Sequence, residues 1–398
     1  MPVVASPFLW RVQMNKSTWR GWTAIASIAA AMGMGVGLGV LIAAGPLNPP
    51  AGVVAGTYKT LTEVEPRIAI SLANTPGDAD SLFKITQPGS YYLTGNITGV
   101  AGKHGIEIVA SGVMLDLNGF GLTGVPGVGL FNGVDVSIAG LTNITIVNGT
   151  VHNWSQNGVH LVGLIGPVTN CRIEGVQATG NIQIGILGSD NSVISRCSAS
   201  GGQIGIYAGS GSTVSECTAT GCSNEGVFAA TGSTITNCSA HDNAGSGFET
   251  SDACTVTNCS ASSNGGIGIS TNNASTVANC TVWASTLDGI RCSASCVIRD
   301  NTCAGNGAIP GDGANIHARF AGNRIEGNNC IGADRGIDVD VAGNIIIRNA
   351  CSSNGVNWDI VAGNAYGPIE LTPAGAAVLG DTAAAALGNT HPNANFTY

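Results

Sequence analysis

The sequence predicts a right-handed parallel β-helix of about twelve coils, with three short strands in each coil and a cap at the N-terminal end. Three observations predict it. A charged fraction of only 10% and 59 glycines in 398 residues oppose helical repeats. Each repeat contains three short stretches in which small or branched residues alternate with others. A glycine followed by an apolar residue recurs every 20 or 21 residues, at Gly185-Ile186, Gly205-Ile206, Gly226-Val227, Gly247-Phe248, Gly268-Ile269 and Gly289-Ile290.

The alternation within one repeat indicates strands with one buried face. Gly, Asn and Ser separate the stretches, as turns require. The repeat continues at looser spacing before residue 185 and with small insertions after residue 290, so we expect one continuous solenoid. In the best-defined repeat the alternating positions are Ile206, Ala208, Ser212, Val214, Cys217 and Ala219.

The N-terminal segment, residues 1–44, is expected to be a signal peptide or a membrane anchor. Positive charges precede a long apolar run, as in export signals, and the run approaches the ~20 residues that span a bilayer. Translation begins at Met1 or Met14 in this interpretation, and residues 45–57 form a linker. The segment predicts a secreted, cell-surface or periplasmic protein. The charges are Arg11, Lys16 and Arg20.

The rest of the chain divides into a cap, the coils and a tail. Residues 58–104 carry larger apolar side chains than the coils, including Phe83 and Tyr91, and we expect them to cap the solenoid. An uncovered end would expose an open strand edge and invite aggregation. The coils are expected over residues 105–364, and a C-terminal cap or tail over residues 365–398.

Equivalent residues of successive coils lie ~4.8 Å apart, so columns in the sequence become ladders in space. Side chains stacked in register point parallel to one another, which disfavours disulfides, and a buried cysteine acts as a small apolar residue. We therefore expect most of the thirteen cysteines to be buried thiols. One column consists of Cys197, Cys217, Cys238, Cys259 and Cys280. A column expected to form a ladder of side-chain amides consists of Asn237, Asn258 and Asn279.

Three stretches resemble the opening of bacterial secreted right-handed β-helix proteins of the pectate-lyase-like superfamily. They are Pro88 to Asn96, Gly105 to Ile108 and Leu115 to Phe120. The resemblance covers roughly residues 60–398 and is specific for the fold rather than for an activity. If the protein is an enzyme, the resemblance implies a polysaccharide lyase, a glycoside hydrolase or a uronate epimerase.

The catalytic motifs of that superfamily match this chain poorly. Polygalacturonase-type sites imply an Asp-Asp pair, which the sequence lacks, and an Arg-Ile-Lys motif, of which Arg172-Ile173-Glu174 has only the first two residues. Pectate lyases imply Ca²⁺ with an Arg or Lys base, and no lysine follows Lys103. No Cys or His spacing indicates a metal site. We predict no metal and no cofactor. A bound Ca²⁺ ion is implied only by the resemblance to pectate lyases, and no motif in this sequence supports it.

Residues that directly follow the repeated Ile or Val should point outward. In the C-terminal coils this position is charged, and two residues further along the same face carries charges too. We expect these side chains to be solvated, with Asp338 orienting His317 for acid–base chemistry. They could equally be solvated cross-strand ion pairs that keep the solenoid soluble. The candidate catalytic residues are His317, Arg319, Asp338 and Asp340, and the candidate substrate-binding residues are Arg291, Tyr207 and Phe228.

Two classes of function fit this sequence. The first is a protein that engages extracellular polysaccharide along the outward face of its C-terminal coils. The second is a non-catalytic structural or adhesive surface protein. A net charge of −9 and the absence of a basic stripe exclude nucleic acid as a partner. Membrane contact is expected only through the N-terminal segment.

Overall fold

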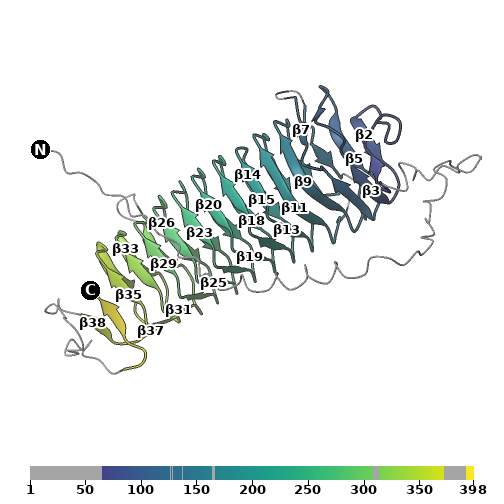
Figure 1. The fold of residues 1–398 in the computed structure, drawn as a ribbon. Coiled ribbons are helices and arrows are strands. Elements are labelled where there is room, and N and C mark those ends of the chain that lie inside the picture. Colours follow the sequence, from purple (N-terminus) through teal and green to yellow (C-terminus); the bar gives the residue numbers. More distant parts are fainter. Residues whose placement is uncertain are drawn as a thin grey trace, which may run out of the picture. The chain divides into compact units, whose positions relative to one another are not determined.

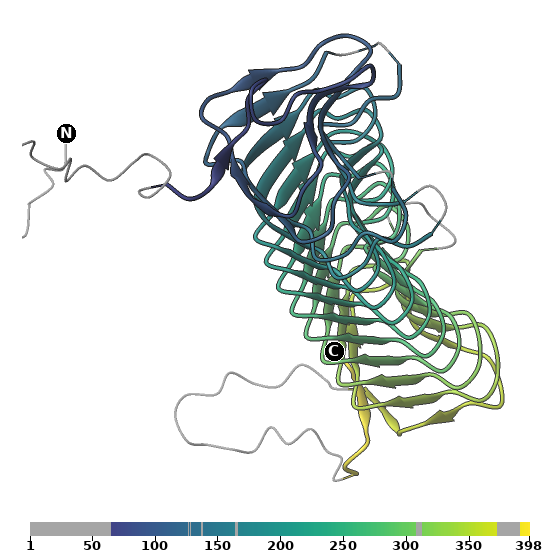
Figure 2. The ribbon, with the colours of Figure 1, turned by 90° about the vertical axis from the view of Figure 1, so that its right-hand side faces the viewer.

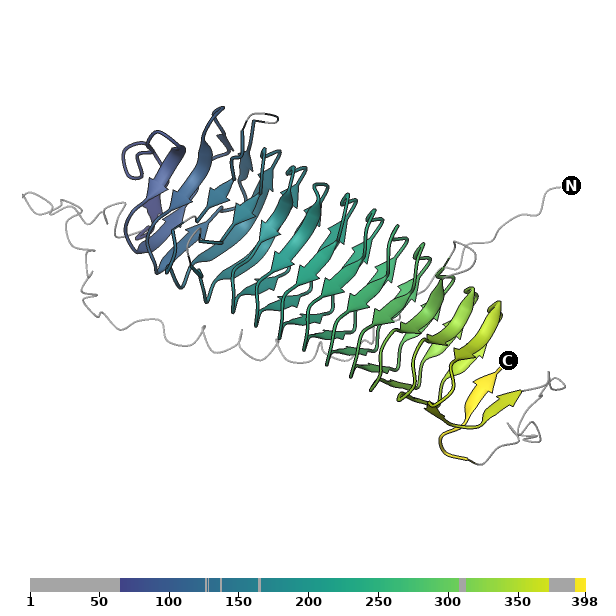
Figure 3. The same cartoon turned by 180° about the vertical axis from the view of Figure 1, so that it is seen from behind.

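The computed structural model describes residues 65–398 except 126, 128, 137, 164–165, 308–312 and 372–390. The expected signal or anchor and the linker therefore lie outside the described residues. Every regular element among the described residues is a β-strand, and the coils follow one another in chain order along one stack (Figures 1 and 3). In this part of the chain no helix is long and apolar enough to cross a membrane.

One face of each coil contributes to a parallel sheet of thirteen strands. The prediction of about twelve coils is thus slightly low. The strands of this sheet are β2 (Ser81–Ile85), β5 (His104–Ile108), β8 (Val134–Asp135), β10 (Val159–His160), β12 (Ile184–Leu187), β15 (Ile204–Ala208), β18 (Val227–Ala229), β21 (Phe248–Thr250), β24 (Ile269–Thr271), β27 (Ile290–Cys292), β30 (Ala314–Ala318), β33 (Arg335–Val339) and β36 (Val356–Ile360).

The other two faces of the coils form two further rows of parallel strands, which β9 (Thr145–His152) and β11 (Arg172–Thr179) join by running through both. The first row contains β1 (Ile68–Ala69), β3 (Gly89–Tyr92), β6 (Val113–Asp116), β13 (Val193–Ser195), β16 (Thr213–Ser215), β19 (Thr234–Thr236), β22 (Thr255–Thr257), β25 (Thr276–Ala278), β28 (Val297–Arg299), β31 (Arg324–Glu326), β34 (Ile345–Ile347) and β37 (Ala365–Tyr366). The second contains β4 (Ile97–Thr98), β7 (Gly121–Thr123), β14 (Ser198–Ser200), β17 (Thr218–Thr220), β20 (Ser239–His241), β23 (Ser260–Ser262), β26 (Thr281–Trp283), β29 (Thr302–Ala304), β32 (Asn329–Ile331), β35 (Ala350–Ser352) and β39 (Asn395–Thr397).

The two ends of the stack are built from the segments expected to cap it. At the N-terminal end, β2 pairs with β5 and β3 pairs with β6, so part of residues 58–104 already forms a coil. At the C-terminal end, β39 pairs with both β35 and β38 (Ile369–Leu371). The protective role of the N-terminal coil stays a prediction.

The recurring glycine allows the coils to stack closely (Figure 2). A Cβ atom on Gly205 would lie 2.7 Å from the carbonyl oxygen of Gly226 and 3.0 Å from the Cβ of Ala219. Since real Cβ atoms do not approach backbone oxygens so closely, only glycine fits there without displacing a strand. The apolar residue after each glycine, such as Ile206, is fully buried in the core.

All thirteen cysteines are buried and none forms a disulfide, which confirms the predicted burial. The predicted amide ladder is wrong in its location. Asn237, Asn258 and Asn279 are exposed at turns with φ of 54–55°, where asparagine tolerates the left-handed conformation. The ladders lie inside the coils instead, and one continues the cysteine column through Asn301, Asn328, Asn349 and Asn395.

Candidate functional site

One column of side chains runs along the outside of the thirteen-stranded sheet. In β15, Ile206 and Ala208 are fully buried, whereas Tyr207 between them is partly exposed. Strand pairing places each member of the column opposite the next. This set, called the outer column here, consists of Lys84, Glu107, Asp135, His160, Leu187, Tyr207, Phe228, Glu249, Ser270, Arg291, His317, Asp338 and Asp359.

The outer column brings together most of the predicted catalytic residues. Arg291, His317 and Asp338 are consecutive members, and Asp340 joins them from the end of β33. Arg319 does not join this group, because its side chain is exposed and its guanidinium carbon lies 5.8 Å from the ring centroid of Phe320. Four of the five predicted charges thus form one group.

Two members of this group are buried, so the prediction of a fully solvated face is wrong. Only 7% of His317 and 7% of Asp338 is exposed. Neighbouring side chains pack against both: Asp340 Oδ2 lies 3.0 Å from His317 Nε2, and Arg335 Nη1 lies 3.3 Å from Asp338 Oδ2. Asp340 itself keeps 45% of its side chain exposed. The group therefore has a buried floor and an exposed rim.

The residue that orients His317 is Asp288, which the sequence analysis did not identify. Its fully buried carboxylate lies 3.1 Å from Nδ1 of His317 and 2.6 Å from Nε of Arg291. It also accepts a hydrogen bond of 2.9 Å from the backbone N–H of Ala314. Asp338 lies 3.9 Å from the other ring nitrogen. The C-terminal cluster is therefore Asp288, Arg291, His317, Asp338 and Asp340.

Burial and charge shift the pKa values within this cluster in different directions. For Asp288, burial favours the neutral acid, but hydrogen bonds from His317 and Ala314 and the nearby Arg291 charge outweigh it and lower the pKa. For His317, burial opposes the charge, yet the contacts with Asp288, Asp340 and Asp338 raise the pKa. For Asp338, burial raises the pKa despite the nearby charges of His317 and Arg335. The surroundings thus shift the pKa values of Asp288 and Asp338, the carboxyl groups on either side of His317, in opposite directions.

Among the described residues, two groups of side chains have the donor atoms and the spacing to hold a cation. His317, Asp338 and Asp340 bring one ligand atom each within 4.8 Å of one another. Near the other end of the outer column, Asp78, Asp80 and Glu107 do the same. There Lys84 Nζ lies 2.6 Å from Asp78 and 2.8 Å from Glu107, so an ammonium group already supplies the positive charge.

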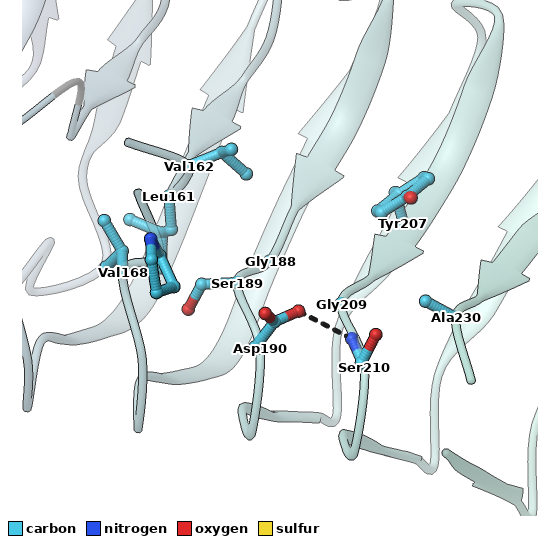
Figure 4. A pocket seen from close by; sticks show the side chains of 11 residues that line it. Leu161, Val162, Val168, Gly188, Ser189, Asp190, Tyr207, Gly209, Ser210 and Ala230 are labelled. Carbon is cyan, nitrogen blue, oxygen red and sulfur yellow. Dashed lines mark hydrogen bonds between the residues drawn. The ribbon is translucent and has the colours of Figure 1, made fainter. Parts of the chain in front are cut away.

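The middle of the outer column is aromatic. The rings of Tyr207 and Phe228 stack with centroids 4.8 Å apart and planes at 16°, as the predicted register requires. A hollow of about 180 Å³ lies beside Tyr207 (Figure 4). Asp190 at its edge accepts a hydrogen bond of 2.8 Å from the backbone N–H of Ser210. The hollow is lined by Leu161, Val162, Pro167, Val168, Gly188, Ser189, Asp190, Tyr207, Gly209, Ser210 and Ala230.

Comparisons with known proteins agree with this architecture. The family described as "Right handed beta helix region" matches residues 132–282, and the family "Periplasmic copper-binding protein (NosD)" matches residues 229–369. No curated protein matches the sequence.

Two solved structures from Azotobacter vinelandii share the fold at low identity. The A-module of mannuronan C-5 epimerase AlgE4 is 16% identical, with a TM-score of 0.58 over 70% of this chain and 90% of that one. The A-module of mannuronan C-5 epimerase AlgE6 is also 16% identical, with a TM-score of 0.56 over 78% of this chain and 90% of that one. With its parallel ladders and its matched coil region, the chain is a right-handed parallel β-helix protein.

Proposed function

We propose that this protein binds an extended extracellular polysaccharide along the outer column. The observation that carries the proposal is the stacked pair Tyr207 and Phe228, at the centre of a straight row of side chains. The two rings stack on each other, so their edges form a continuous, partly exposed apolar surface on the sheet, against which the apolar face of a sugar ring can pack. The hollow beside Tyr207 supplies a concave surface with polar groups at its edge.

The names of the structural neighbours support the same class of ligand. Both are named for mannuronan, a polysaccharide, and both match this chain over most of their length. The matched NosD family is described as periplasmic, which fits the proposed export to the periplasm or the cell exterior. Arg291 and Arg319 provide donors for carboxylates, so we propose an acidic glycan.

The second candidate function is catalysis by the C-terminal cluster. Neighbouring groups with shifted pKa values, such as Asp288, His317 and Asp338, are the arrangement that acid–base catalysis uses. Asp340 forms the exposed rim at Nε2 of His317, where a sugar ring would meet the cluster. Lyase, hydrolase and epimerase reactions all need such proton transfers. Asp338→Asn should then abolish turnover while sparing binding.

The copper named in the matched family description does not fit the C-terminal cluster. Copper sites in proteins favour imidazole and sulfur ligands, and this cluster contains a single histidine and no cysteine. Arg291 and Arg335 already place guanidinium groups beside the carboxylates of Asp288 and Asp338. We therefore assign no copper chemistry to these residues.

The test is calorimetric titration of the full chain with a panel of acidic and neutral polysaccharides. Tyr207→Ala should weaken binding about two- to tenfold, because an aromatic contact contributes roughly 0.5–1.5 kcal/mol. Trp283→Ala is the matched control, since this side chain is 55% exposed on β26, away from the outer column. Equal losses in both variants would contradict the assignment of the outer column. If no polysaccharide binds, the structural or adhesive function is favoured. Assays for unsaturated products, reducing ends and inverted sugars test catalysis in parallel.

A further inference from the structure

A second histidine and aspartate pair lies near the N-terminal end of the outer column. Nδ1 of His160 in β10 lies 3.0 Å from Oδ1 of Asp135 in β8, the preceding strand of the sheet. Asp135 is 2% exposed, and the His160 side chain is 15% exposed. Since a carboxylate can only accept, a neutral His160 carries its N–H on Nδ1 and its lone pair on Nε2.

A buried network holds Asp135 in place. Asn132 Nδ2 donates a hydrogen bond of 2.5 Å to Oδ1 of Asp135. The side-chain oxygen of Asn132 accepts a bond of 3.0 Å from the backbone N–H of Asn157. Asn157 in turn accepts from the backbone N–H of Ile184 at 3.1 Å. This network fixes the carboxylate and therefore the tautomer of His160.

A second imidazole faces the same carboxylate. Nδ1 of His104 lies 3.8 Å from Oδ1 of Asp135 and accepts a 3.0 Å hydrogen bond from the backbone N–H of Asn132. A neutral His104 therefore carries its proton on Nε2. The edge of its ring packs on Phe131, with centroids 5.2 Å apart. The two partly exposed rings thus offer one Nε2 donor and one Nε2 acceptor, the complement of a sugar hydroxyl pair.

The position of His160 connects this pair to the aromatic centre. Two ladder steps, ~10 Å, separate His160 from Tyr207 through Leu187. Leu161 and Val162, which directly follow His160, line the hollow beside Tyr207 (Figure 4). A saccharide packed against Tyr207 therefore reaches His160 if it extends toward the N-terminal coils. Nε2 of His160 has no hydrogen-bonding partner among the described residues.

We propose that His160 and His104 form a hydroxyl-binding subsite for the saccharide units on the N-terminal side of Tyr207. His160 accepts a hydrogen bond at Nε2, His104 donates one, and Asp135 is a positioning residue that fixes the tautomer of His160. This inference rests on the proposed polysaccharide function and extends it by naming a subsite and a direction along the outer column.

The experiment compares variants of the full chain by calorimetric titration with the polysaccharide that the parent binds. His160→Phe keeps a ring and removes the acceptor, so binding should weaken about tenfold, as for one lost hydrogen bond. Asp135→Ala removes the acceptor that holds the proton on Nδ1, so the proton should shift toward Nε2 and binding should weaken by a similar factor. Nitrogen NMR of the imidazoles checks that shift directly, without a ligand.

The matched control is His241→Phe. His241 lies in β20, away from the outer column, with Nδ1 3.0 Å from Asp242. Its replacement should leave the affinity unchanged. If His160→Phe and Asp135→Ala bind like the parent while Tyr207→Ala is weakened, the subsite is refuted and the proposed function stands. If the parent binds no polysaccharide, the proposed function fails, and this inference fails with it.

Discussion

The coils over residues 185–285 and those over residues 288–360 share one backbone ladder but carry different side chains on both of its surfaces. Inside the coils, the cysteine column that begins at Cys197 changes to asparagine after Cys280. Outside, the outer column has one charged residue, Glu249, in the first region, whereas every member of the second region is charged or is a histidine. The strand pairing continues through the change without interruption.

This difference shows that the backbone pairing between coils determines the fold, whereas the side chains of each column determine the chemical properties of its surface. Backbone hydrogen bonds and a small residue after each turn suffice to stack the coils, whether that residue is Cys238 or Asn328. The outer column can then differ from coil to coil, because its side chains lie outside the apolar core. A charged cluster with a buried floor and a partly exposed aromatic pair can therefore occupy one sheet.

The two regions should differ most in how strongly the loss of one side chain of the inner column lowers the free energy of unfolding. The side-chain oxygen of Asn328 accepts bonds from the buried backbone and side-chain N–H groups of Asn301, at 3.0 Å each. Asn328→Ala leaves both without that partner and should lower the free energy of unfolding by about 3 kcal/mol. Cys238→Ala removes a sulfur that accepts a weak hydrogen bond from the backbone N–H of Cys217, together with some packing, so it should cost about 1–2 kcal/mol.

Urea unfolding measures both changes. Asn258→Ala is the matched control for the loss of an asparagine, because Asn258 is exposed at a left-handed turn. It should cost about 1 kcal/mol or less, since only the turn conformation is affected. Equal effects of Asn258→Ala and Asn328→Ala would show that turn geometry, and not the ladder, stabilises these coils.

The charged cluster should also make the C-terminal coils sensitive to pH. The pKa of His317 is raised, so its contribution to stability is full below about pH 6.5 and is lost as the pH rises through the raised value. Asp338 acts in the same direction from about pH 4 upward, because its pKa is raised too. Asp288, whose pKa is lowered, contributes above about pH 4 and loses that contribution in acid.

The measurement is urea unfolding of the parent and of His317→Gln at about pH 5.5 and pH 8.5, either side of the ordinary histidine value. The parent should lose more stability than the variant on going to the higher pH. His241→Gln is the control, because His241 is more exposed and lies on a different face. A parent and a His317→Gln variant with the same pH dependence would contradict the charged pairing of His317 with Asp288.

Periodicity was sufficient to predict the stack, the buried cysteines and the neighbours Tyr207 and Phe228, because a ladder converts sequence spacing directly into contact. Asp288 could not be predicted that way. It precedes β27, which begins at Ile290, and the alternation of faces holds only within a strand. By alternation Asp288 would share the inner side with Ile290, whereas it reaches the outer residues Arg291 and His317.

The burial of His317 and Asp338 escaped prediction for a related reason. A position on the outer face of a strand is solvated only if nothing packs over it, and the periodic pattern carries no information about long neighbours. Here Asp340 and Arg335 pack against the two side chains from adjacent positions. The inner asparagine ladder was not predicted because the exposed asparagines at the turns recur at the same spacing, and spacing alone does not distinguish an exposed column from a buried one.

The smallest change in the free energy of unfolding is expected for a substitution at the exposed rim of the charged region, outside its buried floor. Arg319 is exposed and stacks only loosely on Phe320, so Arg319→Ala should change the free energy of unfolding by less than about 0.5 kcal/mol. It should nevertheless weaken binding of an acidic polysaccharide a few-fold, because a guanidinium attracts carboxylates even from a solvated position. Added salt should remove most of that loss, since exposed charges are screened within about 10 Å at 0.1 M.

Arg299→Ala is the control for a lost surface charge. Arg299 is also exposed but lies in β28, on another face of the coils, where it pairs with Asp300 at 2.9 Å. If the two variants bind equally, the position of the charge on the thirteen-stranded sheet has no influence. If Arg319→Ala alone binds more weakly at low salt, the ligand passes the exposed rim of the C-terminal coils. That result would place both the aromatic centre and the charged coils on one binding face, despite their different side chains.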